Sequence, residues 1–187
     1  MDRIRCGIFS AKTNVPYRAG KLAVKRATGQ IFDKNPALCL IFFSPRYSSP
    51  DLVEGVVQTV PADVVAGCST NGEIASGYWR ESVIAIALST DYMRFGIAAE
   101  SNEKLVTGSK EVYQQFYERA LKDLRDKMIF HASEMFIPVS PHNITPDFGM
   151  IFLPGTDIEL EPKANEVILG LREFAGDLPL IGGISGG

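Results

Sequence analysis

Residues 37–43 are the part of the sequence that most constrains the fold. They read Ala-Leu-Cys-Leu-Ile-Phe-Phe, without one polar side chain. This run is far shorter than the roughly 20 apolar residues that span a bilayer. Its length is that of a β-strand buried on both faces, and such strands are typical of sheets that are covered by helices. The run therefore predicts an α/β fold.

Other segments predict the elements around this strand. Apolar residues with helical spacing alternate along the chain with short strand-like runs. Residues 82–89 and 93–99, joined by Thr90, Asp91 and Tyr92, predict a hairpin. We expect a mixed central sheet with helices flanking it. Its central strands are expected at Cys39, Val64, Ser82 and Phe148, and its helices at Ala19, Leu52, Val112 and Glu166.

Two stretches of the chain are alike, which indicates a partial internal repeat. Residues 40–45 match residues 150–155. Gly55, Gly67 and Ser69 find counterparts in Gly170, Gly183 and Ser185, with one inserted residue between the glycines. The second copy stops where its hairpin is expected, so we expect a truncated unit with exposed apolar surface at residues 180–187. Homo-oligomerisation or downstream sequence would cover that surface. The alternative is that any two strand-helix-strand units look alike.

Charge and cysteine content exclude several classes of partner. The net charge of −3 and the pI near 5.5 provide no basic surface for nucleic acid. No apolar segment follows the first residues, so no membrane partner is expected. The three cysteines, Cys6, Cys39 and Cys68, lie far apart in or beside apolar segments. This pattern predicts reduced, buried thiols in a cytoplasmic protein, without a structural metal site.

The loop that follows the strand at Val64 is the first candidate ligand site. Small residues at a strand end allow a ligand to approach, and hydroxyl, amide and backbone N–H groups can bind it. No GxxxxGK[ST] or GxGxxG motif occurs, so a nucleotide is disfavoured. The alternative is a tight turn with a buried thiol. The loop residues are Gly67, Cys68, Ser69, Thr70, Asn71, Gly72 and Glu73.

Charged residues at strand ends suggest the kind of ligand. Arg46 follows the strand of residues 37–43 and is placed to pair with a carboxylate, whereas Glu73 is placed to meet an amine. Arg80 is better interpreted as a solvated surface residue. If the repeat is real, Gly183 and Ser185 pack beside the first loop. Paired backbone donors with Arg46 nearby would then suit a small carboxylate such as an amino acid.

The order of these motifs resembles the N-terminal domain of the FIST family. The resemblance extends over most of residues 1–187 and rests above all on the sequence GCSTNGE at residues 67–73. It implies one intracellular sensory domain, with the FIST C-terminal domain absent. It also implies output partners such as histidine kinases or cyclic-nucleotide signalling enzymes. Some similar proteins bind haem and respond to nitric oxide.

Two chemical alternatives remain beside ligand sensing. Cys68 would be a nucleophile if His131 or His142 lowered its pKa, but no local nucleophile motif is present. His131 lies between Phe130 and Phe136, where it would serve as a haem ligand. Against these alternatives, we expect a cytoplasmic sensory domain that binds a small ligand, catalyses no reaction and needs no cofactor.

Overall fold

The computed structural model describes residues 4–32, 35–70, 73–74, 78–79, 81–153 and 161–184. The chain divides into two compact units, which are described separately. Unit 1 comprises the residues up to Met93, and unit 2 comprises Arg94–Ile184.

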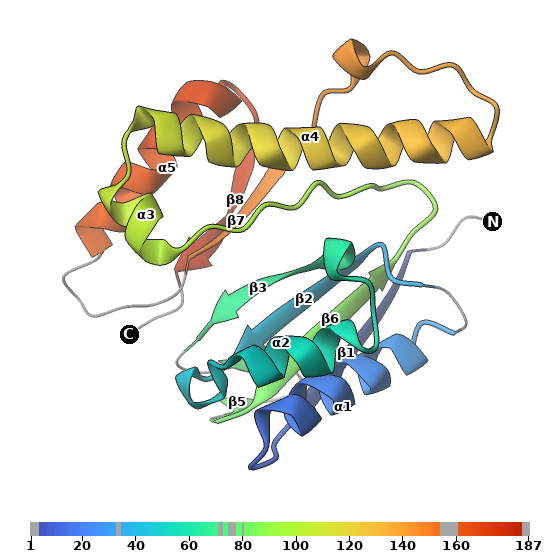
Figure 1. Ribbon diagram of the computed structural model, residues 1–187, viewed down its shortest axis with the longest axis vertical. Helices are drawn as coiled ribbons and strands as arrows, with labels where there is room; N and C mark the ends of the chain where they lie inside the picture. Colours follow the sequence, from blue (N-terminus) through green and yellow to red (C-terminus); the bar gives the residue numbers. More distant parts are fainter. Residues whose placement is uncertain are drawn as a thin grey trace. The chain divides into compact units, whose positions relative to one another are not determined.

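Unit 1 is built on a four-stranded mixed sheet (Figure 1). The strand order is β1 (Arg5–Ala11), β6 (Val83–Ser89), β2 (Leu38–Phe43) and β3 (Val65–Ser69). Strands β2 and β3 are parallel, whereas β6 is antiparallel to both of its neighbours, β1 and β2. The predicted mixed α/β fold and the buried strand within residues 37–43 are therefore confirmed.

Helices α1 (Pro16–Gly29) and α2 (Pro50–Val57) lie side by side on one face of this sheet (Figure 1). Proline at the start of each helix presets the backbone angle that a first turn needs. Ala19, Ala23 and Ala27 lie along one side of α1 and are fully buried. Their small side chains let α1 approach the sheet closely, and they pack there against Val83, Ala85 and Ala87 of β6.

Short elements connect the main ones in unit 1. The one-turn helix η1 (Pro45–Tyr47) follows β2, and the one-turn helix η2 (Ala62–Val64) precedes β3. Strands β4 (Glu73–Ile74) and β5 (Tyr78–Trp79) come after β3 and before β6 in the chain, and they form a separate small antiparallel pair.

Unit 2 contains a long helix, two shorter helices and a small sheet. Its helices are α3 (Asn102–Thr107), α4 (Lys110–Glu134) and α5 (Glu161–Ala175), with a one-turn helix η3 (Pro141–Asn143). Strands β7 (Gly149–Leu153) and β8 (Leu180–Ile184) pair in parallel. The strand expected at Phe148 thus exists, but its predicted place in the central sheet is wrong: β7 pairs with β8 in a sheet of its own.

The predicted hairpin of residues 82–89 and 93–99 is also wrong. Strand β6 already pairs along both edges, so it has no edge left for residues 93–99. That segment runs along α4 instead (Figure 1). The Ile97 N–H donates to Asp123 at 2.8 Å, and Lys127 Nζ donates to the Phe95 carbonyl at 3.1 Å. Side chains of α4 therefore satisfy backbone groups that a hairpin partner would otherwise bind.

None of the helices that the structure describes combines the length and the apolar character needed to cross a membrane.

Candidate functional site

Three strands of unit 1 end at the same edge of the sheet. Strand β6 is antiparallel to β1 and β2, and β3 is parallel to β2, so β1, β2 and β3 all run in one direction. Their carboxyl ends therefore meet beside the start of β6. Ligands of open α/β sheets bind outside the carboxyl ends of strands, and this edge was the predicted location of the site.

A buried tyrosine organises this edge. Tyr47, the last residue of η1, is 1% exposed. Its hydroxyl donates to the Thr13 carbonyl at 2.7 Å and lies 3.1 Å from the Glu81 carbonyl. The segments that follow β1 and β2 and the segment that precedes β6 are thus held together by one phenol group. A second link joins β2 to β6, because the Ser44 N–H donates to the Ser82 carbonyl at 3.0 Å.

Charged side chains surround this tyrosine on the solvent side. Arg46 Nη1 donates to the Glu81 carboxylate at 2.8 Å, and the guanidinium lies 5.2 Å from the centre of the Tyr47 ring. Lys12 Nζ lies 3.8 Å from the same carboxylate. Within the part of the chain that the structure describes, Arg46 Nη2 makes only a long contact, of 3.5 Å, with the Asn14 amide oxygen. Two cations therefore share one carboxylate. We call Lys12, Asn14, Arg46, Tyr47 and Glu81 the strand-end site.

Glu81 has an unusual backbone conformation for a residue with a side chain. Its φ of 55° lies in the left-handed region, which non-glycine residues seldom occupy. Such strain persists where surrounding contacts impose it, and it clusters at ligand sites and switches. Here the contacts of the Glu81 carbonyl and carboxylate hold the residue in place.

The segment predicted as a loop, residues 67–73, lies at the same edge, but Gly67, Cys68 and Ser69 belong to β3 rather than to a loop. The first glycine has a structural role in the sheet. Gly67 has a φ of 150°, and a Cβ there would lie 1.9 Å from the Ile41 carbonyl oxygen. This glycine permits close strand packing. Cys68, Ser69 and Thr70 are half-buried, and the Thr70 N–H donates to the Phe43 carbonyl at 2.7 Å.

Several other predicted site residues cannot be placed in the same detail. Asn71, Gly72, Arg80 and Ser185 lie outside the described residues, and Glu73 is described only as backbone of β4. Gly183 belongs to β8 in unit 2. The expected packing of the two small-residue loops against each other thus stays a prediction.

The cysteines differ in their surroundings. Burial raises the pKa of Cys39 to about 12, which makes its thiol a poor nucleophile at neutral pH. Cys68 is half-buried, whereas Cys6 is exposed, so the expectation of a buried thiol is wrong for Cys6. Exposure alternates along β1 at Cys6, Gly7 and Ile8, with Gly7 buried and its two neighbours exposed, so Cys6 lies on the more exposed face of this strand. The two histidines belong to unit 2, so no imidazole accompanies Cys68 within unit 1.

His131, the predicted haem ligand, lies in the last turn of α4. Its side chain is 37% exposed, and Nδ1 is 4.0 Å from the Glu134 carboxylate. The neighbouring rings of Phe130 and Phe136 are 65% and 95% exposed. The surroundings of His131 are therefore largely open to solvent, and haem ligation stays a prediction. Across the described part of the chain, no three metal-ligating side chains form a cluster.

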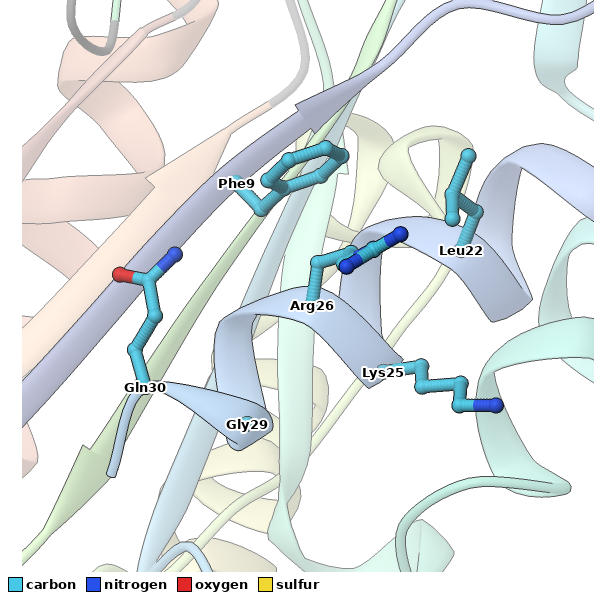
Figure 2. A pocket seen from close by; sticks show the side chains of 6 residues that line it. All are labelled: Phe9, Leu22, Lys25, Arg26, Gly29 and Gln30. Atoms are coloured by element: carbon cyan, nitrogen blue, oxygen red, sulfur yellow. The ribbon is translucent and has the colours of Figure 1, made fainter. Parts of the chain in front are cut away.

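A hollow of about 580 Å³ lies on another part of unit 1 (Figure 2). Phe9 of β1 and Leu22 of α1 give it an apolar lining, and Lys25 and Arg26 of α1 add two cations. Gln30 binds the Ile8 carbonyl and N–H at 2.9 and 3.1 Å, which fixes one wall. No sequence motif indicated this hollow, and Leu22 at its rim is 36% exposed.

Sequence analysis also missed four members of the strand-end site, namely Lys12, Asn14, Tyr47 and Glu81. One signal could have found Glu81, since it directly precedes a predicted central strand. Lys12 and Asn14 likewise follow the first strand, at the edge where ligands collect.

Comparison with known proteins agrees with the resemblance seen in the sequence. The model of the FIST N domain matches residues 37–187. A search of curated proteins found no match. The matched part contains β2, β3, β6 and all of unit 2, and within the strand-end site it includes Arg46, Tyr47 and Glu81. The chain therefore belongs to the FIST N domain family, whose members are sensory domains of signal transduction.

Proposed function

We propose that this sensory domain binds a small zwitterionic carboxylate, such as an amino acid, at the strand-end site and catalyses no reaction. The observation that carries the proposal is the convergence of Lys12, Arg46 and Glu81 where three parallel strands end. This arrangement offers both charge signs to one ligand. It stays accessible, because the side chains of Arg46 and Glu81 are 38% and 57% exposed.

The two charged groups of the ligand would bind to residues of opposite charge in the strand-end site. A guanidinium has five N–H donors in a planar fork and binds carboxylates in bidentate fashion. In the strand-end site one of its two terminal nitrogens is held by Glu81, and among the described residues the other terminal nitrogen makes only the long contact with Asn14. A ligand carboxylate that takes the guanidinium would compete with Glu81. The released Glu81 carboxylate could then accept a hydrogen bond from the ligand ammonium.

This exchange of partners provides a route for the signal. Glu81 lies two residues before β6, the strand that pairs with both β1 and β2. A new position of Glu81 would change the strained backbone at φ 55° at the entrance to this strand. An output partner, such as a histidine kinase or a cyclic-nucleotide signalling enzyme, would respond to that change.

The absence of catalysis is also part of the proposal. Within unit 1 the candidate nucleophile Cys68 has no histidine to activate it, since both histidines belong to unit 2. Cys39 is a poor nucleophile because burial raises its pKa to about 12. A thiol enzyme would instead show rapid, pH-dependent alkylation of Cys68 and a turnover that Cys68→Ala abolishes.

Calorimetry with a panel of amino acids and small carboxylates tests the ligand class. We expect Arg46→Ala to weaken a bound amino acid about tenfold, which corresponds to about 1.4 kcal/mol. Arg18→Ala, which removes an exposed arginine from α1, is the matched control and should leave affinity unchanged. Equal affinity in Arg46→Ala and wild type would refute the strand-end site.

An absorption spectrum of the purified protein tests the haem alternative separately. The proposal expects no Soret band. A band that disappears in His131→Ala would instead favour a haem sensor.

A further inference from the structure

The hollow beside α1 combines apolar and cationic side chains and has no acid in its described lining (Figure 2). Phe9 is half-buried and Leu22 is 36% exposed, so both present apolar surface to solvent. Lys25 and Arg26 are exposed beside them. The volume of about 580 Å³ falls within the range of about 300–1,000 Å³ that small-molecule pockets occupy. The hollow thus offers a small molecule apolar contacts and positive charge, without negative charge.

The two cations of the hollow are not neutralised by neighbouring groups. Within the described part of the chain, the side chains of Lys25 and Arg26 take part in no ion pair or hydrogen bond. Lys21, on the same helix, instead contacts the Gln58 side chain at 3.3 Å. The sequence of α1 includes four Lys and Arg residues and no Asp or Glu. The charges of the hollow therefore favour an anionic ligand.

Gly29, the last residue of α1, keeps one wall of the hollow open. Close packing explains two other glycines of unit 1. A Cβ on Gly7 would lie 2.0 Å from the Ala27 carbonyl oxygen, and one on Gly20 would lie 2.7 Å from the Leu52 carbonyl oxygen. A Cβ on Gly29 would meet nothing within 4 Å, and its φ lies outside the left-handed region. Glycine destabilises a helix relative to alanine, yet neither packing nor backbone conformation requires it here. The missing side chain leaves space for a ligand.

The hydrogen bonds of Gln30 fix the wall next to β1. Its side-chain amide accepts from the Ile8 N–H at 3.1 Å and donates to the Ile8 carbonyl at 2.9 Å. An amide NH₂ group has two donors, and the second has no partner among the described residues. This wall is thus held in place before any ligand binds, and it adds a neutral donor near Phe9.

The side chains of α1 differ in how they face Phe9. Arg26 lies on the side of the helix that faces Phe9, and Leu22 lies one turn before it (Figure 2). Lys25 extends away from Phe9 at the rim (Figure 2). A ligand that rests an apolar body on Phe9 and Leu22 would place an acidic group within reach of the Arg26 guanidinium, whereas Lys25 would contribute its charge from further away.

We propose that this hollow binds a small apolar monocarboxylate that carries no ammonium group. Arg26 binds the carboxylate, and Phe9 and Leu22 contact the apolar body. An amino acid is disfavoured, because its ammonium group would face two cations and no carboxylate. The strand-end site differs in this respect, since Glu81 supplies a carboxylate there. The two sites therefore select different ligands, and this proposal is independent of the ligand at the strand-end site.

An NMR titration of the whole chain with phenylpropionate tests the proposal. We expect saturable amide shifts at Phe9, Leu22, Arg26 and Gln30. Phenylalanine has the same ring and carboxylate but adds an ammonium group, and phenylpropionamide replaces the carboxylate by a neutral amide. Both should bind the hollow at least about tenfold more weakly than phenylpropionate. Equal binding of either compound at the hollow would overturn the proposed ligand class.

Charge variants of α1 separate this site from a general attraction of anions to a cationic helix. Arg26→Gln should weaken phenylpropionate at least about tenfold, and Lys25→Gln only about threefold, because Lys25 lies at the rim. Arg18→Gln removes the same charge from an exposed position outside the lining and should leave affinity unchanged. Equal affinity in Arg26→Gln and Arg18→Gln would overturn the assignment of Arg26.

Variants at Gly29 test the hollow itself. Gly29→Trp should fill the open wall and abolish binding, whereas Gly29→Ala should bind like wild type. Neither variant should lower the melting temperature, because the added Cβ meets nothing within 4 Å. Unchanged binding in Gly29→Trp would overturn the proposal. So would the lack of saturable shifts at the lining residues of wild type, whatever calorimetry shows for amino acids at the strand-end site.

Discussion

Units 1 and 2 each contain a parallel pair of strands, and the two described sheets differ in the number of strands around that pair. In unit 1, Ile41 lies next to the middle strand β6 and is 4% exposed. Ile151 pairs with Gly182 as Ile41 pairs with Gly67, but it lies in a two-stranded sheet and is half-buried. The difference teaches that the middle strand, more than the order of helices and strands, determines how deep the core is.

The largest expected effect comes from Gly67→Val in the closed sheet. Its Cβ would meet the Ile41 carbonyl oxygen at 1.9 Å, and a φ of 150° disfavours any side chain. We expect a loss of about 4 kcal/mol in the free energy of unfolding, measured by urea denaturation.

Two controls make this result specific. Gly29→Ala should change stability by less than about 1 kcal/mol, because nothing lies within 4 Å of the added atom. Gly182→Val introduces the same local clash in the two-stranded sheet of β7 and β8. Faster amide hydrogen exchange in unit 2 should report the resulting loss of stability. If Gly67→Val were as stable as Gly29→Ala, the pairing of β2 with β3 would be wrong.

Alanine substitutions of Ile41 and Ile151 should give the next largest difference in stability. We expect Ile41→Ala to cost about 3 kcal/mol, because it leaves a cavity in a closed core. Ile151→Ala should cost about 1 kcal/mol, since its side chain is already partly in water. Denaturation curves of the two variants measure the difference directly. Equal losses would mean that both sheets are equally closed.

Much of this fold could be predicted from local patterns. The apolar run of residues 37–43 and the four-residue spacing along α4 identify elements whose burial depends on their own sequence. Strand partners were harder to predict. Residues 93–99 have the composition of a strand, but two of their backbone groups bond to Asp123 and Lys127 of α4, which lie 26 and 32 positions further along the chain. No local pattern reports such contacts.

Variants of Asp123 test how residues 93–99 are held against α4. Asp123→Ala removes the acceptor of the Ile97 N–H and the partner of Lys127, which lies 2.6 Å away. We expect a cost of about 1 kcal/mol. Asp123→Asn keeps an acceptor oxygen and should lose less. Hydrogen exchange at Ile97 should be faster in Asp123→Ala than in Asp123→Asn, and equal rates would remove this contact from the comparison.

The smallest expected effect is a pH dependence confined to unit 2. Hydrogen bonds from the Ser101 N–H and from Lys104 lower the pKa of Glu100 below its ordinary value of 4.5. The carboxylate therefore stabilises the fold above pH 4.5, and this contribution is lost as the pH falls through the lowered pKa. Glu100→Gln should remove this part of the acid sensitivity in thermal melts at different pH values. A melt profile identical to wild type would contradict the assignment.

The sequence indicated where the strand-end site lies, but it identified few of the residues that form the site. Arg46 was found because it follows a recognisable buried strand. Tyr47 and Glu81 were missed because their roles depend on the meeting of three segments distant in sequence. The glycine loop was identified as a ligand site, whereas Gly67 itself serves the close approach of β3 to β2.

An NMR titration of the full chain with amino acids tests the central claim most directly. We predict saturable amide shifts at Lys12, Asn14, Arg46, Tyr47 and Glu81, with none in unit 2, and their loss in Arg46→Ala. Shifts centred on Phe9, Lys25 and Arg26 would place the ligand in the hollow beside α1. Either that result or an unperturbed strand-end site at saturating ligand would contradict the account.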